Sequence, residues 1–238
     1  MVSLFFAETI STSNTQVLEK DEAHHAIKVL RLNKGEIIKI SDGVKNWVLG
    51  PIADISKKSV SISITERGQI QSESPELILV QAITKSDRGK EMLELAVEAG
   101  VDQIIPWLSE RSISKWQSDS YEKWSTGVKQ TCKQSRQVKL PRILPAINTI
   151  EVAKLFNNQS MGVVFHEGAS SKFSQISIPN SLKSIYLIIG PEGGISDQEL
   201  ELFTSNGGKA VRLGETVLRS AHAGFAAISA MQTKLGRW

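Results

Sequence analysis

The chain has 238 residues, of which 40% are hydrophobic and 22% charged, a composition typical of a globular protein with a buried core. Its formal net charge of +3 permits an anionic partner without requiring one. A single cysteine, Cys132, excludes an internal disulfide and a multi-cysteine metal site, so a reducing, cytoplasmic location is expected. The first residues lack the basic segment of a signal peptide, and no apolar run approaches the roughly 20 residues of a membrane span. We therefore expect no membrane association.

The first 70 residues are rich in strand patterns. Short apolar or alternating segments predict strands at residues 4–7, 36–43, 46–55 and 59–66. In the last of these, Val60, Ile62 and Ile64 share one face. One helix is predicted at residues 21–32, with Gly35 just beyond its end. The pattern favours a small β-barrel with one helix, followed by a polar linker at residues 68–75.

After the linker, strands and helices alternate. Strands are predicted at residues 76–83, 101–108, 161–166, 184–190 and 209–214. Helices are predicted at residues 87–99, 118–137, 150–156, 197–205 and 217–235. Ser196 and Glu199 have the spacing of a capping box at the start of one of them. This alternation predicts an α/β domain with a largely parallel sheet over residues 75–238.

Three of these strands end in unusual sequences, and ligands of parallel sheets bind beyond the carboxyl ends of the strands. The three ends are His166-Glu167-Gly168, Gly190-Pro191-Glu192-Gly193-Gly194 and Leu213-Gly214-Glu215. A tight turn alone would use glycine and proline, but three glycines and a proline in five residues favour a ligand site. Neither G-x-G-x-x-G nor a P-loop lysine is present there, which argues against a nucleotide-phosphate loop.

The start of the last helix carries a cation where the helix dipole disfavours one. Arg219 directly follows the third of these turns, so we expect it to have an anionic or carbonyl partner, with a surface arginine as the alternative. The helix itself is rich in small residues, which predict close packing within the chain or against a second subunit. They are Ala221, Ala223, Gly224, Ala226, Ala227, Ser229 and Ala230.

Basic and aromatic residues cluster in the middle of the chain. Such a mixture suits RNA, through phosphate contacts and base stacking, and fits a solvated helix face about as well. The basic residues are Arg111, Lys115, Lys123, Lys129, Lys133, Arg136, Lys139 and Arg142, and the aromatic ones Trp116, Tyr121 and Trp124. The N-terminal helix adds His24, His25, Lys28 and Arg31, whose histidines lack partners at metal-ligand spacing, so no metal is predicted. Lys85, Asp87 and Arg88 follow another strand end, as substrate contacts or simply as a polar helix start.

Two segments resemble the SPOUT family of S-adenosylmethionine-dependent RNA methyltransferases, and most closely its ribosomal RNA small subunit methyltransferase E group. They are LIIGPEGGISDQEL and VRLGETVLRSAHAGFAAISAMQ. The segment HHAIKVLRLNKGEIIKISDG resembles the PUA-like barrel of that group. QAITKSDRGKEMLELAVEAGVDQIIPWLSERS resembles the start of its catalytic domain, and KQSRQVKLPRI its segment ending in an arginine and a proline.

The resemblance implies a fold and an activity. It implies a PUA-like RNA-binding barrel over residues 1–70 and a SPOUT methyltransferase domain over residues 75–238, with a deep trefoil knot. It also implies a homodimer with its active site near the interface. The implied reaction is methylation of N3 of one uridine, number 1498, in the 16S rRNA of the small ribosomal subunit.

The resemblance also implies roles for single residues. Arg219 would stabilise negative charge on a uracil carbonyl, and Glu192 would orient the base or accept its proton. The implied contacts of S-adenosylmethionine are His166, Glu167, Gly168, Ile188, Gly190, Pro191, Glu192, Gly193, Gly194, Leu213, Gly214, Val217 and Leu218. The expected substrate contacts are His25, Arg31, Lys85, Arg88, Arg111 and Arg136.

One departure from the family stands beside the catalytic arginine. The family often has Thr-Glu-Thr there, whereas this chain has Ser220-Ala221-His222, which keeps a hydroxyl and lacks the carboxylate. Two other functions remain open from the sequence: a SPOUT enzyme with another RNA target, and an RNA-binding protein with a vestigial cofactor pocket.

Overall fold

The computed structural model describes residues 2–238, apart from the side chains of Ser86 and Asp87, so the expected role of Asp87 lies outside the described residues. The chain forms two compact units. The first comprises Met1–Ser72 with Lys129–Leu140, and the second comprises Glu73–Val128 with Pro141–Trp238. Helix α3 (Ser120–Ser135) therefore begins in the second unit and ends in the first. Within residues 2–238, no helix has both the length and the apolar character needed to cross a membrane.

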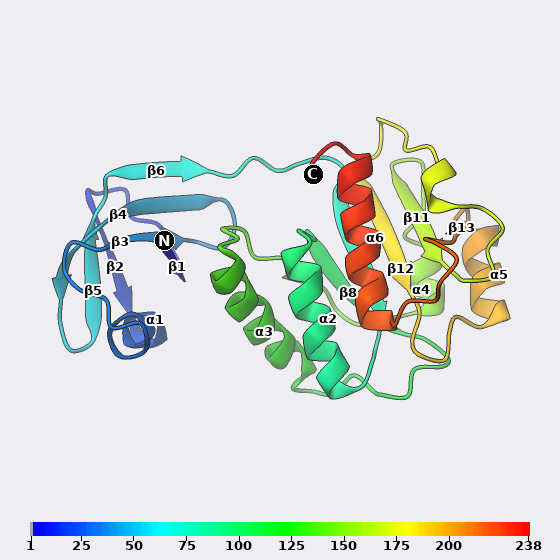
Figure 1. The fold of residues 1–238 in the computed structure, drawn as a ribbon, viewed down its shortest axis with the longest axis horizontal. Coiled ribbons are helices and arrows are strands. Elements are labelled where there is room, and N and C mark those ends of the chain that lie inside the picture. The colour runs from blue at the N-terminus through cyan, green and yellow to red at the C-terminus, as the bar shows by residue number, and fades with distance from the viewer. Residues whose placement is uncertain (1) are drawn as a thin grey trace. The chain divides into compact units, whose positions relative to one another are not determined.

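The first unit is built on one six-stranded sheet (Figure 1). Its strands run in the order β1-β3-β4-β5-β2, and β6 pairs with β4. The bounds are β1 Ser3–Phe6, β2 Thr15–Glu19, β3 Ile37–Ser41, β4 Asn46–Ile55, β5 Ser59–Ser63 and β6 Glu66–Gln69. Val60 and Ile62 are buried in the core, and Ile64 packs against it, as their shared face predicts. The sequence pattern missed β2 and β6.

The single predicted helix of this unit consists of two kinds of helix. α1 (Lys20–His24) continues directly into a π-helix, η1 (His25–Val29), in which the Leu30 amide bonds the His25 carbonyl at 2.9 Å. Arg31 follows with a φ of +53°, a left-handed conformation that α-helices do not contain. The helix thus ends before residue 32, which corrects the predicted end.

The second unit contains a parallel sheet in the strand order β10-β8-β7-β12-β11-β13, with β9 paired to β8. The bounds are β7 Glu76–Ala82, β8 Gln103–Leu108, β9 Arg142–Ile143, β10 Ile147–Asn148, β11 Ser160–Phe165, β12 Ser184–Ile189 and β13 Lys209–Val211. The chain adds β8 on one side of β7, and β12 on the other, so the strand order reverses between β7 and β12. Such a switch point is where ligands of parallel sheets bind.

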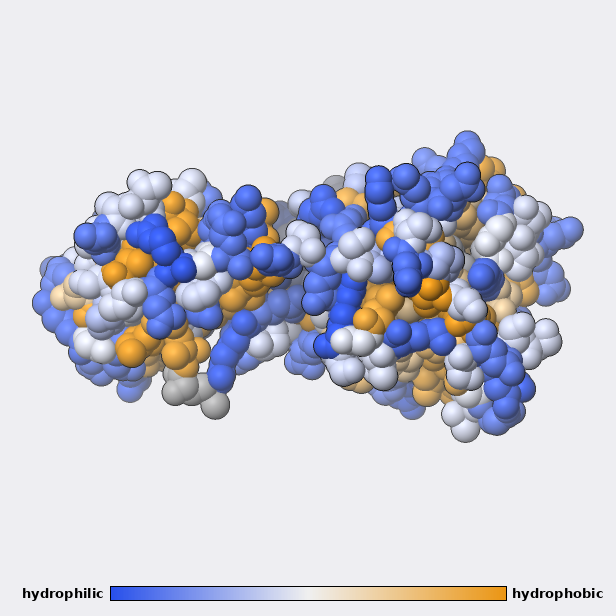
Figure 2. Space-filling view, turned by 90° about the horizontal axis from the view of Figure 1, so that it is seen from above, coloured by the Kyte–Doolittle hydropathy of each residue, from blue (hydrophilic) through white to orange (hydrophobic). Residues whose placement is uncertain are grey.

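Helices cover both faces of this sheet (Figure 1). α2 (Ser86–Glu98) and α6 (Ser220–Lys234) pack together on one face. α4 (Thr149–Ala153) and α5 (Asp197–Ser205) pack on the other, over a core that includes Trp107 and Phe203. A short 3-10 helix, η2 (Phe173–Gln175), follows β11. In the view of Figure 2, the surface of each unit is largely hydrophilic, with hydrophobic residues in small separate groups.

Most of the predicted elements of this unit are confirmed, α5 residue for residue. Ser196 and Glu199 form the predicted capping box, with both reciprocal hydrogen bonds present. The last helix is corrected: it begins at Ser220, three residues later than predicted, because Arg219 has the extended backbone of an N-cap (φ −62°, ψ 146°). Val217 and Leu218 therefore belong to the preceding loop, where both are exposed.

Candidate active site

The strand ends singled out from the sequence meet at the carboxyl edge of the parallel sheet, around two neighbouring cavities. The larger, about 380 Å³, is lined by the turn after β12, by the loop before α6 and by Glu167 after β11. The smaller, about 110 Å³, is lined by residues 212–218 with His166 and Glu167. Both cavities are lined by Phe165, Glu167, Val217, Leu218 and Ala223, so they lie next to each other.

The turn at residues 190–194 is closed by its own backbone. The Gly194 amide donates to the Pro191 carbonyl at 3.0 Å, and Gly194 has a φ of +74°, which favours glycine. At Gly190, a Cβ would lie 2.7 Å from the Cγ1 of Ile195, so no larger residue fits without movement. The glycines therefore let this turn fold tightly at the edge of the larger cavity.

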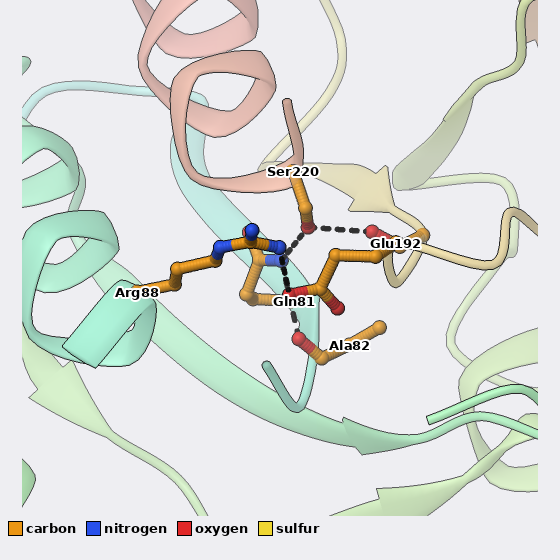
Figure 3. Close-up of polar contacts among 6 residues, drawn as sticks. Gln81, Ala82, Arg88, Glu192 and Ser220 are labelled. Carbon is orange, nitrogen blue, oxygen red and sulfur yellow. Dashed lines mark hydrogen bonds and ion pairs between the residues drawn. The ribbon is translucent and has the colours of Figure 1, made fainter. Parts of the chain in front are cut away.

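Two arginines hold this turn from outside. Arg111, on the loop after β8, donates from Nη1 to the Gly193 carbonyl at 3.1 Å. Arg88, in the first turn of α2, donates from Nη1 to Oε1 of Glu192 at 3.0 Å (Figure 3). The Glu192 side chain is 23% exposed and that of Arg88 51% exposed, so this ion pair lies at the mouth of the cavity. It fixes the direction of the Glu192 carboxylate.

A chain of hydrogen bonds underlies the same site (Figure 3). Gln81, at the end of β7, donates from Nε2 to Oγ of Ser220 at 2.9 Å, and Ser220 donates to the Gly190 carbonyl at 2.6 Å. Gln81 is fully buried and Ser220 is 8% exposed. These bonds join β7, the turn after β12 and the start of α6 at the switch point of the sheet.

The structure brings together most, not all, of the predicted site residues. Arg88, Glu192 and Arg219 line the larger cavity with Gly190, Pro191 and Gly194, while His166, Leu213 and Gly214 line the smaller one. Gly193 contacts Arg111, and the Gly168 amide bonds Nδ1 of His166 at 3.1 Å. Ile188 is buried in the core cluster that faces α4 and α5. Lys85 is the exposed N-cap position of α2, and His25, Arg31 and Arg136 belong to the first unit.

Sequence reasoning missed several residues of the site. Phe165, Ile189, Ile195 and Ala223 line the larger cavity, but apolar residues at such positions look like ordinary core in the sequence. Gln81 did leave a signal, because it is a polar residue at the end of an apolar strand whose two faces are both covered by helices. A buried polar side chain requires hydrogen-bond partners, and that requirement could have marked it.

Two models of known protein families match this chain and identify the class of protein to which it belongs. A family model described as an RNA methyltransferase domain matches residues 72–232, and one described as an RNA methyltransferase PUA domain matches residues 18–65. The chain thus has the domains of an RNA methyltransferase with a PUA domain.

Single relatives identify the family within this class of protein. The ribosomal RNA small subunit methyltransferase E of Mycobacterium bovis is 31% identical, over 99% of this chain and 93% of the relative. That of Bacillus subtilis is 27% identical, over 97% of this chain and 95% of the relative. The crystal structure of the enzyme of that name from Neisseria gonorrhoeae, bound to S-adenosyl methionine, superposes with a TM-score of 0.89 at 28% identity, covering 98% of both chains. The chain belongs to the ribosomal RNA small subunit methyltransferase E family.

This membership confirms the predicted fold class, an α/β methyltransferase domain preceded by a PUA-like domain. A trefoil knot is consistent with these relatives. A second solved relative, from Legionella pneumophila, also contains the cofactor S-adenosylmethionine and superposes with a TM-score of 0.86 at 25% identity, over 98% of both chains.

Proposed function

We propose that this protein transfers a methyl group from S-adenosylmethionine to N3 of one uridine, the one numbered 1498, in the 16S rRNA of the small ribosomal subunit. A ribosomal substrate implies that the protein works in the cytoplasm. The observation that carries the proposal is the cavity at the switch point of the sheet. There a glycine-rich turn, an ion-paired glutamate and Arg219 line one space of about 380 Å³.

The cavity suits the cofactor. Its volume lies within the usual range for small-molecule sites, roughly 300–1,000 Å³. Apolar side chains such as Phe165, Val217 and Leu218 supply surface for an adenine ring, while the turn at residues 190–194 offers backbone polar groups. Glu167 supplies a carboxylate for a cationic group such as the amino group of the methionine part. When bound, the cofactor supplies an electrophilic methyl group on a sulfonium.

The protein's own residues account for the rest of the reaction. Attack by uracil N3 requires loss of its proton, and negative charge then develops on the neighbouring carbonyl oxygens. We assign Arg219 to stabilise that charge, because its guanidinium can donate to a carbonyl oxygen and it lines the larger cavity. We assign Glu192 to orient the base or accept its proton, with Arg88 holding the carboxylate in place.

RNA contacts are proposed on both units. Beyond β8, Trp116 and Trp124 pack edge to face with ring centroids 4.9 Å apart, and the nearby Tyr121 is 56% exposed. Exposed aromatic rings beside lysines can stack on unpaired bases. The substrate contacts we assign are His25, Arg31, Lys85, Arg88, Arg111 and Arg136, within an RNA-binding domain at 1–70 and a catalytic domain at 75–238.

We also propose a homodimer formed through α6. One side of this helix is buried within the unit, through Gly224, Ala227 and Met231, among others. A second side, with Ala223, Phe225, Ala226, Ser229 and Ala230, is only partly buried. Apart from Phe225, the residues of this strip are small and allow a second copy to approach closely. Sedimentation of the full chain tests this, and a monomer at all concentrations would contradict it.

The direct test uses labelled cofactor and small subunits from cells that lack this methylation. We expect one labelled nucleotide per subunit, and its mapping identifies the base and the atom. Label at another base or at a ribose hydroxyl would instead favour a SPOUT enzyme with a different target. Titration calorimetry with S-adenosylmethionine separates both from an RNA-binding protein with a vestigial pocket, which would not bind the cofactor.

A further inference from the structure

The hydrogen bonds around Ser220 have only one possible direction. The Ala82 carbonyl can only accept, so the Gln81 group 3.2 Å from it must be the amide NH₂, which also faces Ser220. The Ser220 oxygen therefore accepts from Gln81, and its single proton is left for the Gly190 carbonyl, 2.6 Å away. The hydroxyl proton is thus committed to the Gly190 carbonyl, and one lone pair of the oxygen to the Gln81 amide.

The hydrogen bond from Gln81 to Ser220 comes with an unfavourable feature of the Gln81 side chain. Gln81 is fully buried, and its Oε1 has no hydrogen-bond partner among the described residues. An unpaired buried oxygen is unfavourable, so the amide is not explained by stability alone. The absence of a side chain at Gly224, one turn along α6, gives this oxygen its room, because a Cβ there would lie 3.3 Å from it.

Ser220 lies between the two groups that we assign to catalysis. It directly follows Arg219, whose backbone is extended and whose side chain makes no capping bond. Its hydroxyl bonds the carbonyl of Gly190, two residues before Glu192. A single buried hydroxyl therefore ties the backbone that precedes Glu192 to the backbone that follows Arg219.

We infer that Ser220, hydrogen-bonded to Gln81, is a positioning residue. It fixes the backbone next to Arg219 and so holds the Arg219 side chain in place for methyl transfer. This inference rests on the proposed role of Arg219.

The first experiment compares three variants by the rate of label transfer to small subunits at saturating cofactor. Misplacing a catalytic group by about 1 Å can cost roughly a hundredfold, so we expect Ser220→Ala to lower kcat about tenfold or more, with little change in KM for RNA. Ser220→Thr keeps the hydroxyl and should restore the rate. The matched control is Thr233→Ala, which removes another hydroxyl of α6, bonded to the Ser229 carbonyl at 3.0 Å and outside the strip proposed for the dimer.

The second experiment separates positioning from a general structural effect. If Ser220 acts through Arg219, then Ser220→Ala should cost less than about threefold in a background that already carries Arg219→Ala. Cofactor affinity, measured by calorimetry on the same variants, should stay within about threefold of the unmodified protein. Should Ser220→Ala fail to fold, Gln81→Leu removes the same support from the other side and should lower kcat in the same direction.

Three results would overturn the inference: an unchanged rate in Ser220→Ala, losses that multiply in the double variant, or a loss confined to cofactor affinity. A wrong assignment of the methylated nucleotide can be distinguished from these three results. Total label reports the rate whichever nucleotide is methylated, whereas nucleotide mapping reports the target.

Discussion

Arg219 and Glu192 line one cavity but are held in different ways. Glu192 is directed by an ion pair with Arg88, whereas Arg219 depends on the backbone at the start of α6. Removing either side chain should therefore affect the chemical step more than cofactor binding, since most of the residues that line the cavity are glycines or apolar residues.

For Arg219→Ala we expect kcat to fall by about a hundredfold, the usual loss when one group that stabilises transition-state charge is removed. Affinity for S-adenosylmethionine, followed by calorimetry, should change little. The control is Arg142→Ala, which removes an arginine paired with Glu76 at the opposite edge of the same sheet. Full turnover by Arg219→Ala with normal cofactor binding would refute the assignment.

Glu192→Gln keeps the size of the side chain and removes its ability to accept a proton. If Glu192 accepts the uracil proton, kcat should fall roughly 10- to 100-fold and the pH–rate profile should lose the limb that reports the carboxylate. Arg88→Ala serves as the companion variant, because it frees the carboxylate without removing it. An unchanged profile and rate in Glu192→Gln would exclude the residue from the proton path.

The helices and strands that could be predicted from the sequence are those that depend on local rules. The apolar run in β7, the capping box of α5 and the alternation in β5 each reflect a regular periodicity or a local hydrogen bond, and each is present. The π-helix η1 was not predictable, because its hydrogen bonds shift by one residue with little change in the pattern. The bond from Ser220 to Gly190 joins residues 30 positions apart, and only the folded sheet brings them together.

The turn after β12 gives a prediction from sterics. In Gly190→Ala, the added methyl group would lie 2.7 Å from the side chain of Ile195, so the turn must shift. We expect cofactor affinity to fall about tenfold or more, in line with the sensitivity of packed sites to small displacements. Gly127→Ala is the control, since its Cβ would meet Leu93 at an ordinary 3.7 Å. Equal cofactor affinity in both variants would contradict this account.

Within the first unit, one buried carboxylate binds α3 through two ion pairs. Glu22 accepts from Lys129 and Lys133 at 2.9 Å each. Burial raises the pKa of Glu22, but the hydrogen bonds and charges of Lys133 and Lys129 outweigh it, and the pKa falls below 4.5. The stabilisation is therefore present above about pH 4.5 and lost as the pH falls through the lower, folded-state pKa.

Glu22→Gln should accordingly destabilise the protein at pH 7 by about 1–2 kcal/mol, or roughly 2–8 °C in Tm, and the difference from the unmodified protein should shrink towards pH 3. Glu8→Gln is the control, because its ion pair with Lys20, at 3.8 Å, is almost fully exposed. A Tm difference that persists undiminished under acid conditions would show that the ion pairs are not its cause.

The formal charge of +3 on the whole chain is too small to identify the partner, and the distribution of charge matters more. Arg31 and Arg136 are both exposed and both have left-handed backbones, with φ of +53° and +59°. Such conformations are unfavourable for residues other than glycine and are found more often at functional sites.

If these arginines contact RNA phosphates, Arg31→Ala and Arg136→Ala should each weaken binding to small-subunit RNA about three- to tenfold and reduce the salt dependence by about one counterion. Lys45→Ala removes an exposed charge from a turn of the same unit and should leave both unchanged. Filter binding over a series of salt concentrations measures both the RNA affinity and its salt dependence. If Lys45→Ala had the same effect as the two arginine variants, the contribution of the arginines would come from net charge alone.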